Sequence, residues 1–581
     1  MEEYIYEMLG SKRRRKKVVL YIILALVLAV MMIPTKIVLA KMLPGKSANT
    51  FSVYVDTATN SSISETKKVT DCVVNYFKKE PSVHDMEVYL GQGAPLDYAG
   101  LVKGSALKQM KNQAEIVVNL TDKHSRDEPS YSLVHRVRKE LQFECIAHKK
   151  GTTIKFVEMP SGPPTLATVV INLFGTDATL MRSTAKTISE VLTQTEGLVD
   201  VDIMQDDIYP KYEIIPDKEK IIRSGLSVEQ VNNILYLAFK GMIVAVKNSK
   251  MQQDQIPIFV RLNDESRSIF PNTREGLYWK LSRLKLMNPK GMMIPIKEMV
   301  SVEEVDSNPS IFRKNLRNLV TITAECDMVS QVYPLLEARD MLIEKLSKDF
   351  NVSKVDGITT YMFDLNLVDK KSKEKLLLRW DGEMKVSLDT FRDLGGAFIA
   401  ALILMFLLMV VYYKSFALSG IVLLASFLSI IGVIIGHFIT DIISLVFSGT
   451  NFFLTATSLI GFISLMGISA RSSLLLIDFS KALIEKGIEK RRAIAISTAT
   501  RAKPILMTAV AIILGSLLLS TDPIFGGLGI ALIFGSMAST VVSLFLVPIM
   551  INNTVAICPL VGDEKAECKG GITEHVDPEK L

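Results

Sequence analysis

Apolar runs long enough to cross a bilayer stand at the two ends of the sequence. A bilayer core is covered by roughly 20 apolar helical residues. Between the runs, residues 36–392 are polar, so 22% of the chain is charged although 49% is hydrophobic. The pattern predicts six transmembrane helices, one before and five after a large aqueous domain, at Val18–Ile33, Leu394–Tyr413, Ile421–Ile439, Phe452–Phe479, Pro504–Leu519 and Phe525–Met550.

The run Phe452–Phe479 carries a charge inside it. Arg471 lies near mid-membrane, where a guanidinium costs on the order of 3 kcal/mol unless it faces the bundle interior and finds a partner. Ser464 and Gly467 share its helical face and would let a neighbouring helix pack closely, and Asp478 lies two turns further along. Such a charge predicts a functional role. The alternative is an arginine that snorkels or pairs only for structure.

A second basic residue stands at the start of the next run. Lys503 lies in the segment RAKPILMTA, and Thr508 adds a hydroxyl one and a half turns deeper. The alternative for Lys503 is a simple anchor at the cytoplasmic surface. A proton relay also needs a group that changes charge, and an arginine stays protonated. Asp441 and Asp478 lie near span ends, so the middle of the spans offers the basic half of a relay without its acidic half.

Basic residues indicate the orientation. Six of them, at positions 12–17, precede the first run, and five more lie between Lys481 and Lys503, which predicts a cytoplasmic loop there. Both termini are therefore expected in the cytoplasm and the large domain on the far side of the membrane. The net charge of +6 does not indicate nucleic-acid binding, because the basic residues gather beside the spans.

The aqueous region repeats a strand, helix, strand order. Ser62 and Glu65 form a capping box before one helix, and Asp177 caps another. This spacing predicts several split βαβ sandwiches in series. Between residues 211 and 295 the rhythm changes, and Ser227 with Gln230 forms a further capping box, which indicates an inserted subdomain. The predicted fold class is an α+β membrane protein.

Enzyme signatures are missing from the sequence. It contains no hydrolytic triad, metal cluster, P-loop or dinucleotide fingerprint, so we expect neither an enzyme nor a cofactor. The five cysteines show no paired spacing and are expected to be free thiols. The histidines, including His437, are expected to be ordinary surface or packed residues. Met292 and Met293 could bind a soft cation, although methionine is also a flexible packing residue.

Three segments resemble the C-terminal half of resistance-nodulation-cell division (RND) efflux permeases of the acriflavine-resistance type. They are GISARSSLLLIDFSKALIEKG, RAKPILMTAVAIILGSLLL and IPIKEMVSVEEVDSNPSIFRKNLRNLVTITAECD. The resemblance implies βαβ porter subdomains that bind substrate and an inserted docking subdomain. It also implies a trimer that works with a periplasmic adaptor and an outer-membrane channel. The chain is then divided into a cytoplasmic N-terminus (1–17), a first transmembrane helix (18–43), porter-type subdomains (44–210), a docking-type insertion (211–295), a returning porter-type segment (296–392), transmembrane helices 2–6 (393–550) and a cytoplasmic tail (551–581).

The chain departs from the family's relay pattern. Arg471 stands where the family has a lysine, and Lys503 where it has an arginine. The family's paired aspartates belong to an N-terminal half that this chain lacks. The resemblance implies a half-size, proton-driven subunit in the inner membrane that exports drugs or small amphiphiles with a separate N-terminal half-permease chain. The alternatives are a non-transporting accessory or remnant half-permease and a heavy-metal efflux subunit. A protein-export role fits the insertion less well.

Overall fold

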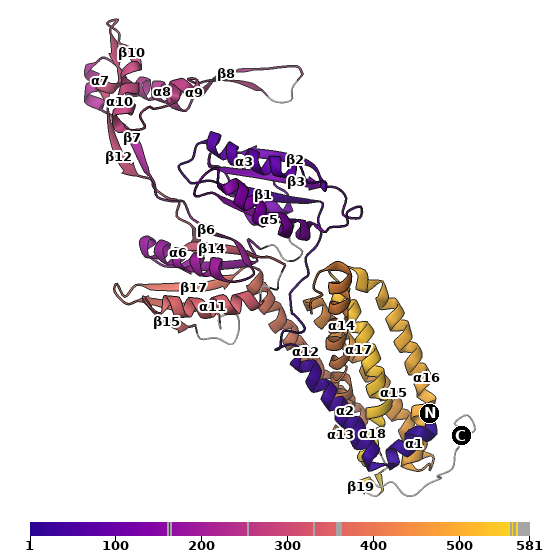
Figure 1. Ribbon diagram of the computed structural model, residues 1–581. Coiled ribbons are helices and arrows are strands. Elements are labelled where there is room, and N and C mark those ends of the chain that lie inside the picture. The colour runs from indigo at the N-terminus through magenta and orange to yellow at the C-terminus, as the bar shows by residue number, and fades with distance from the viewer. Residues whose placement is uncertain are drawn as a thin grey trace. The chain divides into compact units, whose positions relative to one another are not determined.

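Two compact units make up the chain in the computed structural model (Figure 1). One unit is Gln205–Ile311, and the other combines Met1–Met204 with Phe312–Leu581. The structure describes residues 1–159, 162, 165–251, 255–328, 330, 332–355 and 363–557, together with the tail strands β18 (Leu560–Val561) and β19 (Lys565–Ala566).

The first α+β subdomain is a four-stranded antiparallel sheet with two helices on one face. Its strand order is β2-β3-β1-β4, the order of a split βαβ fold. Its apolar core lies between the sheet and the two helices. The capping box of Ser62 and Glu65 is confirmed at the start of the first helix. The elements are β1 (Thr50–Asp56), α3 (Ile63–Phe77), β2 (Val83–Leu90), β3 (Gln113–Leu120), α5 (Ser130–Ile146) and β4 (Thr153–Val157).

The second α+β subdomain is assembled from segments on both sides of the insertion. Strand β14 pairs with both β5 and β6, which precede it by more than a hundred residues. The strand order is β13-β14-β5-β17-β16-β15, with β6 on β14. Asp177 caps its first helix as predicted. The elements are β5 (Val169–Phe174), α6 (Ala178–Gln194), β6 (Leu198–Met204), β13 (Arg313–Lys314), β14 (Arg317–Cys326), α11 (Val332–Leu346), β15 (Phe350–Lys354), β16 (Leu365–Asp369) and β17 (Lys375–Asp381).

The inserted unit extends beyond residues 211–295 at both ends. The antiparallel strands β7 (Pro210–Pro216) and β12 (Val300–Asp306) pair along their length, and its own apolar core includes Ile221, Leu281 and Val302. The capping box of Ser227 and Gln230 is confirmed. Its other elements are α7 (Lys218–Arg223), α8 (Val228–Phe239), β8 (Met242–Lys247), β9 (Ile256–Val260), α9 (Asp264–Arg267), α10 (Arg274–Arg283), β10 (Lys285–Met287), β11 (Met293–Pro295) and the 3-10 helix Ile296–Met299.

Among the described residues, five helical segments are long and apolar enough to cross a membrane. The expected first span falls on α2 (Lys12–Met31), whose opening turns are basic, so its apolar stretch is shorter. A six-helix count therefore stays a prediction. The helices of the second block are α12 (Glu383–Tyr413), α13 (Phe416–Phe427), α14 (Ile430–Ser448), α15 (Ala456–Glu485), α16 (Lys490–Leu517), α17 (Gly526–Val541), a π-helical segment (Val542–Leu546) and α18 (Val547–Asn553).

The prediction of a loop at Lys481–Lys503 is wrong. Helix α15 continues to Glu485 and α16 begins at Lys490, so most of the basic residues lie on helices. Pro504, the predicted start of a span, lies inside α16. A proline is tolerated within a packed membrane helix, where neighbouring groups satisfy the freed carbonyl. The residues before it, Ala493–Thr498, are buried, and this packing holds them in the helix.

One end of the helix bundle gathers the N-terminal helix α1 (Glu2–Gly10), the start of α16 and the end of α18. Arg492 of α16 pairs with Glu2 at 2.9 Å and with Glu3 at 3.0 Å. Lys490 donates to the Thr554 carbonyl at 2.6 Å. At another point of the bundle, residue 40 forms a parallel bridge with residue 454, just before α15.

The expectation of free thiols is wrong for one pair. Cys72 of α3 and Cys145 of α5 form a disulfide with Cα atoms 5.7 Å apart. They are 73 residues apart in sequence, and only the side-by-side packing of the two helices brings them together. Cys326 is free. Cys558 and Cys568 lie outside the residues whose side chains are described.

Candidate functional site

The predicted coupling residues of α15 lie on a face that the other described helices of the chain leave uncovered. Ser464, Gly467 and Arg471 are all exposed at helical spacing. A Cβ added to Gly467 would meet no described atom within 4 Å. The opposite face of the same helix is buried, with Leu465 and Leu476 in the bundle core. Arg471 therefore points away from the interior of this bundle.

The structure does not bring the predicted relay residues into contact with each other. Among the described residues, neither Arg471 nor Lys503 forms an ion pair or hydrogen bond. Lys503 and Thr508 are exposed on α16. The Thr508 hydroxyl donates to the Ile505 carbonyl at 2.8 Å within its own helix. Asp478 instead accepts from the Tyr412 hydroxyl of α12 at 3.3 Å.

A buried polar cluster links α14, α15 and α17. The His437 ring of α14 is fully buried, with Nδ1 2.8 Å from the Val433 carbonyl oxygen and Nε2 2.8 Å from Ser458 Oγ. Ser458 is also 3.0 Å from Thr455 Oγ1. A Cβ on Gly527 of α17 would lie 2.4 Å from both hydroxyls, so only glycine lets α17 pack here. Both ring nitrogens have partners, which suits a histidine that ties helices together.

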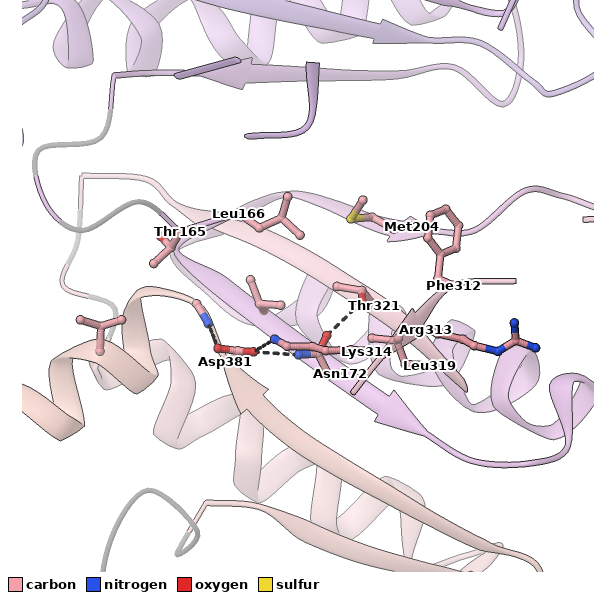
Figure 2. Close-up of a pocket in the computed structure, with 13 residues that line it drawn as sticks. Thr165, Leu166, Asn172, Met204, Phe312, Arg313, Lys314, Leu319, Thr321 and Asp381 are labelled. Carbon is pink, nitrogen blue, oxygen red and sulfur yellow. Dashed lines mark hydrogen bonds and ion pairs between the residues drawn. The ribbon is translucent and has the colours of Figure 1, made fainter. Parts of the chain in front are cut away.

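A pocket of about 450 Å³ opens on the second α+β subdomain (Figure 2). Its floor is Asp381, which ends β17. Asp381 accepts from Asn172 and from the Gly382 backbone N–H, both at 3.0 Å, and pairs closely with Lys314. Burial alone would raise the pKa of Asp381, but Lys314 lowers it below its usual value. Leu166, Val170, Met204, Phe312, Leu319 and Val386 supply apolar walls.

The pocket residues were not predicted from the sequence, because they come from four separate segments. Asn172 and Thr321 alternate with Ile171 and Ile322, which face the helices, so these polar side chains stand on the helix-free face of the sheet. Alternation in two buried strands was the only available signal. The arrangement is a polar floor with apolar walls, able to hold an amphipathic small molecule.

The split βαβ sheets, the insertion and the long apolar helices together define an α+β protein of the membrane class. The sequence matches the model of the AcrB/AcrD/AcrF family over residues 2–353 and 366–552. The chain belongs to this family.

Three relatives of this chain are named for different properties. The multidrug resistance protein MdtC of Photorhabdus laumondii is 23% identical over 450 residues, 76% of this chain and 39% of MdtC. The cobalt-zinc-cadmium resistance protein CzcA of Cupriavidus metallidurans is 24% identical over 411 residues, 68% of this chain and 34% of CzcA. The swarming motility protein SwrC of Bacillus subtilis is 23% identical over 389 residues, 65% of this chain and 32% of SwrC.

A solved structure shares the fold. The crystal structure of a heavy metal efflux pump (crystal form II) superposes with a TM-score of 0.69 at 17% identity, covering 94% of this chain and 51% of the pump chain. This chain therefore spans about a third of the length of the named relatives and half of the solved pump chain.

Proposed function

We propose that the chain is a half-size subunit of a proton-driven RND efflux transporter that exports drugs or other small amphiphiles across the inner membrane. It would work with a second chain, an N-terminal half-permease that supplies intramembrane aspartates. A periplasmic adaptor and an outer-membrane channel would complete a trimeric assembly. Arg471 and Lys503 would be the basic partners of those aspartates, with Thr508 and Asp478 beside them.

The observation that carries this proposal is the uncovered face of α15. A guanidinium on a lipid-facing surface at mid-membrane costs on the order of 3 kcal/mol, and this cost is removed when a partner helix supplies a carboxylate. Ser464 and Gly467 add little bulk to the same face, so a partner helix could approach closely.

The disulfide supports the proposed orientation. Disulfides persist in oxidising compartments and are rare in the cytosol. The Cys72–Cys145 bond lies in the first α+β subdomain, which fits a location outside the cytoplasm. The basic residues before α2 and at the start of α16 fit the cytoplasmic side.

The substrate class has two candidates. The pocket with a charge-balanced floor and apolar walls favours small amphiphiles, as does the relative named for multidrug resistance. A metal-ion substrate is favoured by the methionines of the β10 and β11 hairpin, where exposed Met287 and Met293 are direct cross-strand partners with Met292 beside them. Thioethers bind soft cations. Among the described residues, no group of three or more His, Cys, Asp or Glu could hold a metal.

The test is purification of the tagged chain from its native membrane in mild detergent, with co-purifying proteins identified by mass spectrometry. We expect a second multi-span chain that carries intramembrane aspartates. Gly467→Leu should lose that partner while leaving this chain's own packing intact, because its Cβ site is empty. Gly396→Leu, at a site on α12 where a Cβ likewise meets nothing within 4 Å, is the matched control.

Efflux by the assembled complex then tests the charge. Arg471→Met should abolish efflux, whereas Lys481→Met, which removes a charge from the same helix closer to its end, should not. Retained efflux in Arg471→Met would refute the coupling role. Recovery of the tagged chain without any membrane partner would instead favour an accessory or remnant protein.

A further inference from the structure

The two α+β subdomains meet across an interface of opposite charge. Among the described residues, three ion pairs and one histidine–aspartate hydrogen bond cross it. The lysine, arginine and histidine members all belong to residues 98–157 of the first subdomain. The acidic members belong to β6, to the end of β14 or to the residue after it in the second subdomain. The pairs are Arg138 with Asp200, Lys155 with Asp202 at 2.5 Å, Lys103 with Glu325 at 2.8 Å, and His135 with Asp327 at 2.8 Å. Lys103 ends the short helix α4 (Tyr98–Lys103).

The Asp200 carboxylate lies at this interface and is surrounded by hydrogen-bond donors of the first subdomain. Its side chain is 1% exposed and that of Arg138 is 6% exposed. Arg138 pairs with one carboxylate oxygen, and the Phe156 backbone N–H donates to the same oxygen at 2.9 Å. Gln142 donates to the other oxygen at 2.9 Å. All three donors come from α5 and β4 of the first subdomain, so the carboxylate of β6 is bonded to the opposite subdomain.

The side chains that bind Asp200 are held in place by contacts within the first subdomain. The Gln142 amide also donates to the Ile154 carbonyl at 2.7 Å. The Arg138 guanidinium lies 5.0 Å from the centre of the Phe156 ring. Side chains fixed in this way lose little further entropy when they receive a carboxylate, so the site is preorganised.

The backbone at Asp200 departs from a regular strand. Its φ is +52°, in the left-handed region that non-glycine residues visit rarely. The pairing of β6 with β14 shifts register at the same place, which marks a bulge. Bulges redirect side chains at strand edges, and a sparsely populated backbone conformation persists where surrounding contacts hold it.

We propose that the buried ion pair of Asp200 and Arg138, called the latch below, holds the two α+β subdomains together as one body. The subdomains separate only when this ion pair is broken. Loss of either buried partner leaves the other charge uncompensated, which is far more costly than loss of a surface pair. The neighbouring Lys155 and Asp202 pair is partly exposed, at 18% and 26%, and adds a weaker second contact. This inference concerns the chain's own residues and does not depend on the transport role.

The test is a distance measurement between spin labels on the two subdomains of the full-length chain in detergent. Labels go on Phe143→Cys of α5, where the native side chain is 88% exposed, and Lys186→Cys of α6, in a background with Cys326, Cys558 and Cys568 replaced by serine. The chain with Asp200 should give one narrow distance distribution. Asp200→Ala and Arg138→Gln should each add a longer distance, with the ratio of open to closed molecules raised roughly a hundredfold.

Two further variants keep the test decisive. Glu190→Gln removes a carboxylate from a surface pair with Lys345 inside the second subdomain and should leave the distribution unchanged. Lys155→Met should add a smaller open population and serves where Asp200→Ala fails to form the Cys72–Cys145 disulfide. The latch is refuted if a folded Asp200→Ala keeps the narrow distribution. It is also refuted if the chain with Asp200 is already broadly distributed.

Discussion

Removal of the Cys72–Cys145 disulfide should destabilise the first α+β subdomain selectively. The bond closes a loop of 73 residues between α3 and α5. In the chain-entropy model, opening a loop of this length costs about 4 kcal/mol, and measured losses for native disulfides span roughly 2–5 kcal/mol. The two helices also pack through Val73, Phe77 and Val137, so the fold should persist with a lower free energy of unfolding.

The measurement is pulse proteolysis in urea of the purified full-length chain, read by mass spectrometry of peptides from residues 50–157. A loss of about 3 kcal/mol lowers the midpoint by roughly 1–3 M, because small domains have urea slopes of about 1–3 kcal/mol per M. The variant with Cys72→Ala and Cys145→Ala and the reduced native chain should shift alike. Cys326→Ala, at the free thiol, should keep the native response to reductant.

The opposite result would refute this reasoning. If the native chain unfolds at the same urea concentration with and without reductant, the disulfide does not constrain the unfolded subdomain. A shift of equal size in peptides from the second α+β subdomain would show that the two subdomains unfold as one unit.

Three further predictions concern other parts of the chain. Burial raises the pKa of Glu158, which faces Arg138, Glu325, Lys41 and Asp327, to about 7 from 4.5, so stability should fall as pH rises from about 4.5 through 7. Glu158→Gln should remove this dependence and stabilise the subdomain by roughly 2–3 kcal/mol at pH 8, measured by protease resistance; an unchanged pH profile would contradict it. Gly432→Ala places a Cβ 2.2 Å from the Phe534 carbonyl oxygen and should lower thermal stability in detergent by about 1–3 kcal/mol, unlike Gly396→Ala. Arg492→Gln breaks the pairs with Glu2 and Glu3. It should make residues 1–11 more susceptible to proteolysis, while the rest of the chain should unfold at the native rate.

Local signals read directly from the sequence located most of the elements. The capping boxes at Ser62 and Ser227 and the cap at Asp177 begin helices in the structure, because a cap depends only on residues within one turn. The predicted strand, helix, strand order recurs in both α+β subdomains, and period-two alternation is equally local. Apolar length similarly predicted the five segments of the C-terminal block that are long and apolar enough to cross a membrane. The family resemblance rested on short contiguous motifs.

Features that depend on distant residues were settled only by the tertiary structure. The disulfide and the union of β5, β6 and β14 in one sheet join segments separated by many residues, and no local pattern encodes such pairings. Helix α16 begins at Lys490 and not at the predicted Pro504, because burial of Ala493–Thr498 outweighs the local preference of Pro504 to begin a helix. Spacing alone placed Arg471 on one helical face with Gly467. Whether that face lies inside or outside the bundle depends on how all the helices pack, and in this chain it lies outside.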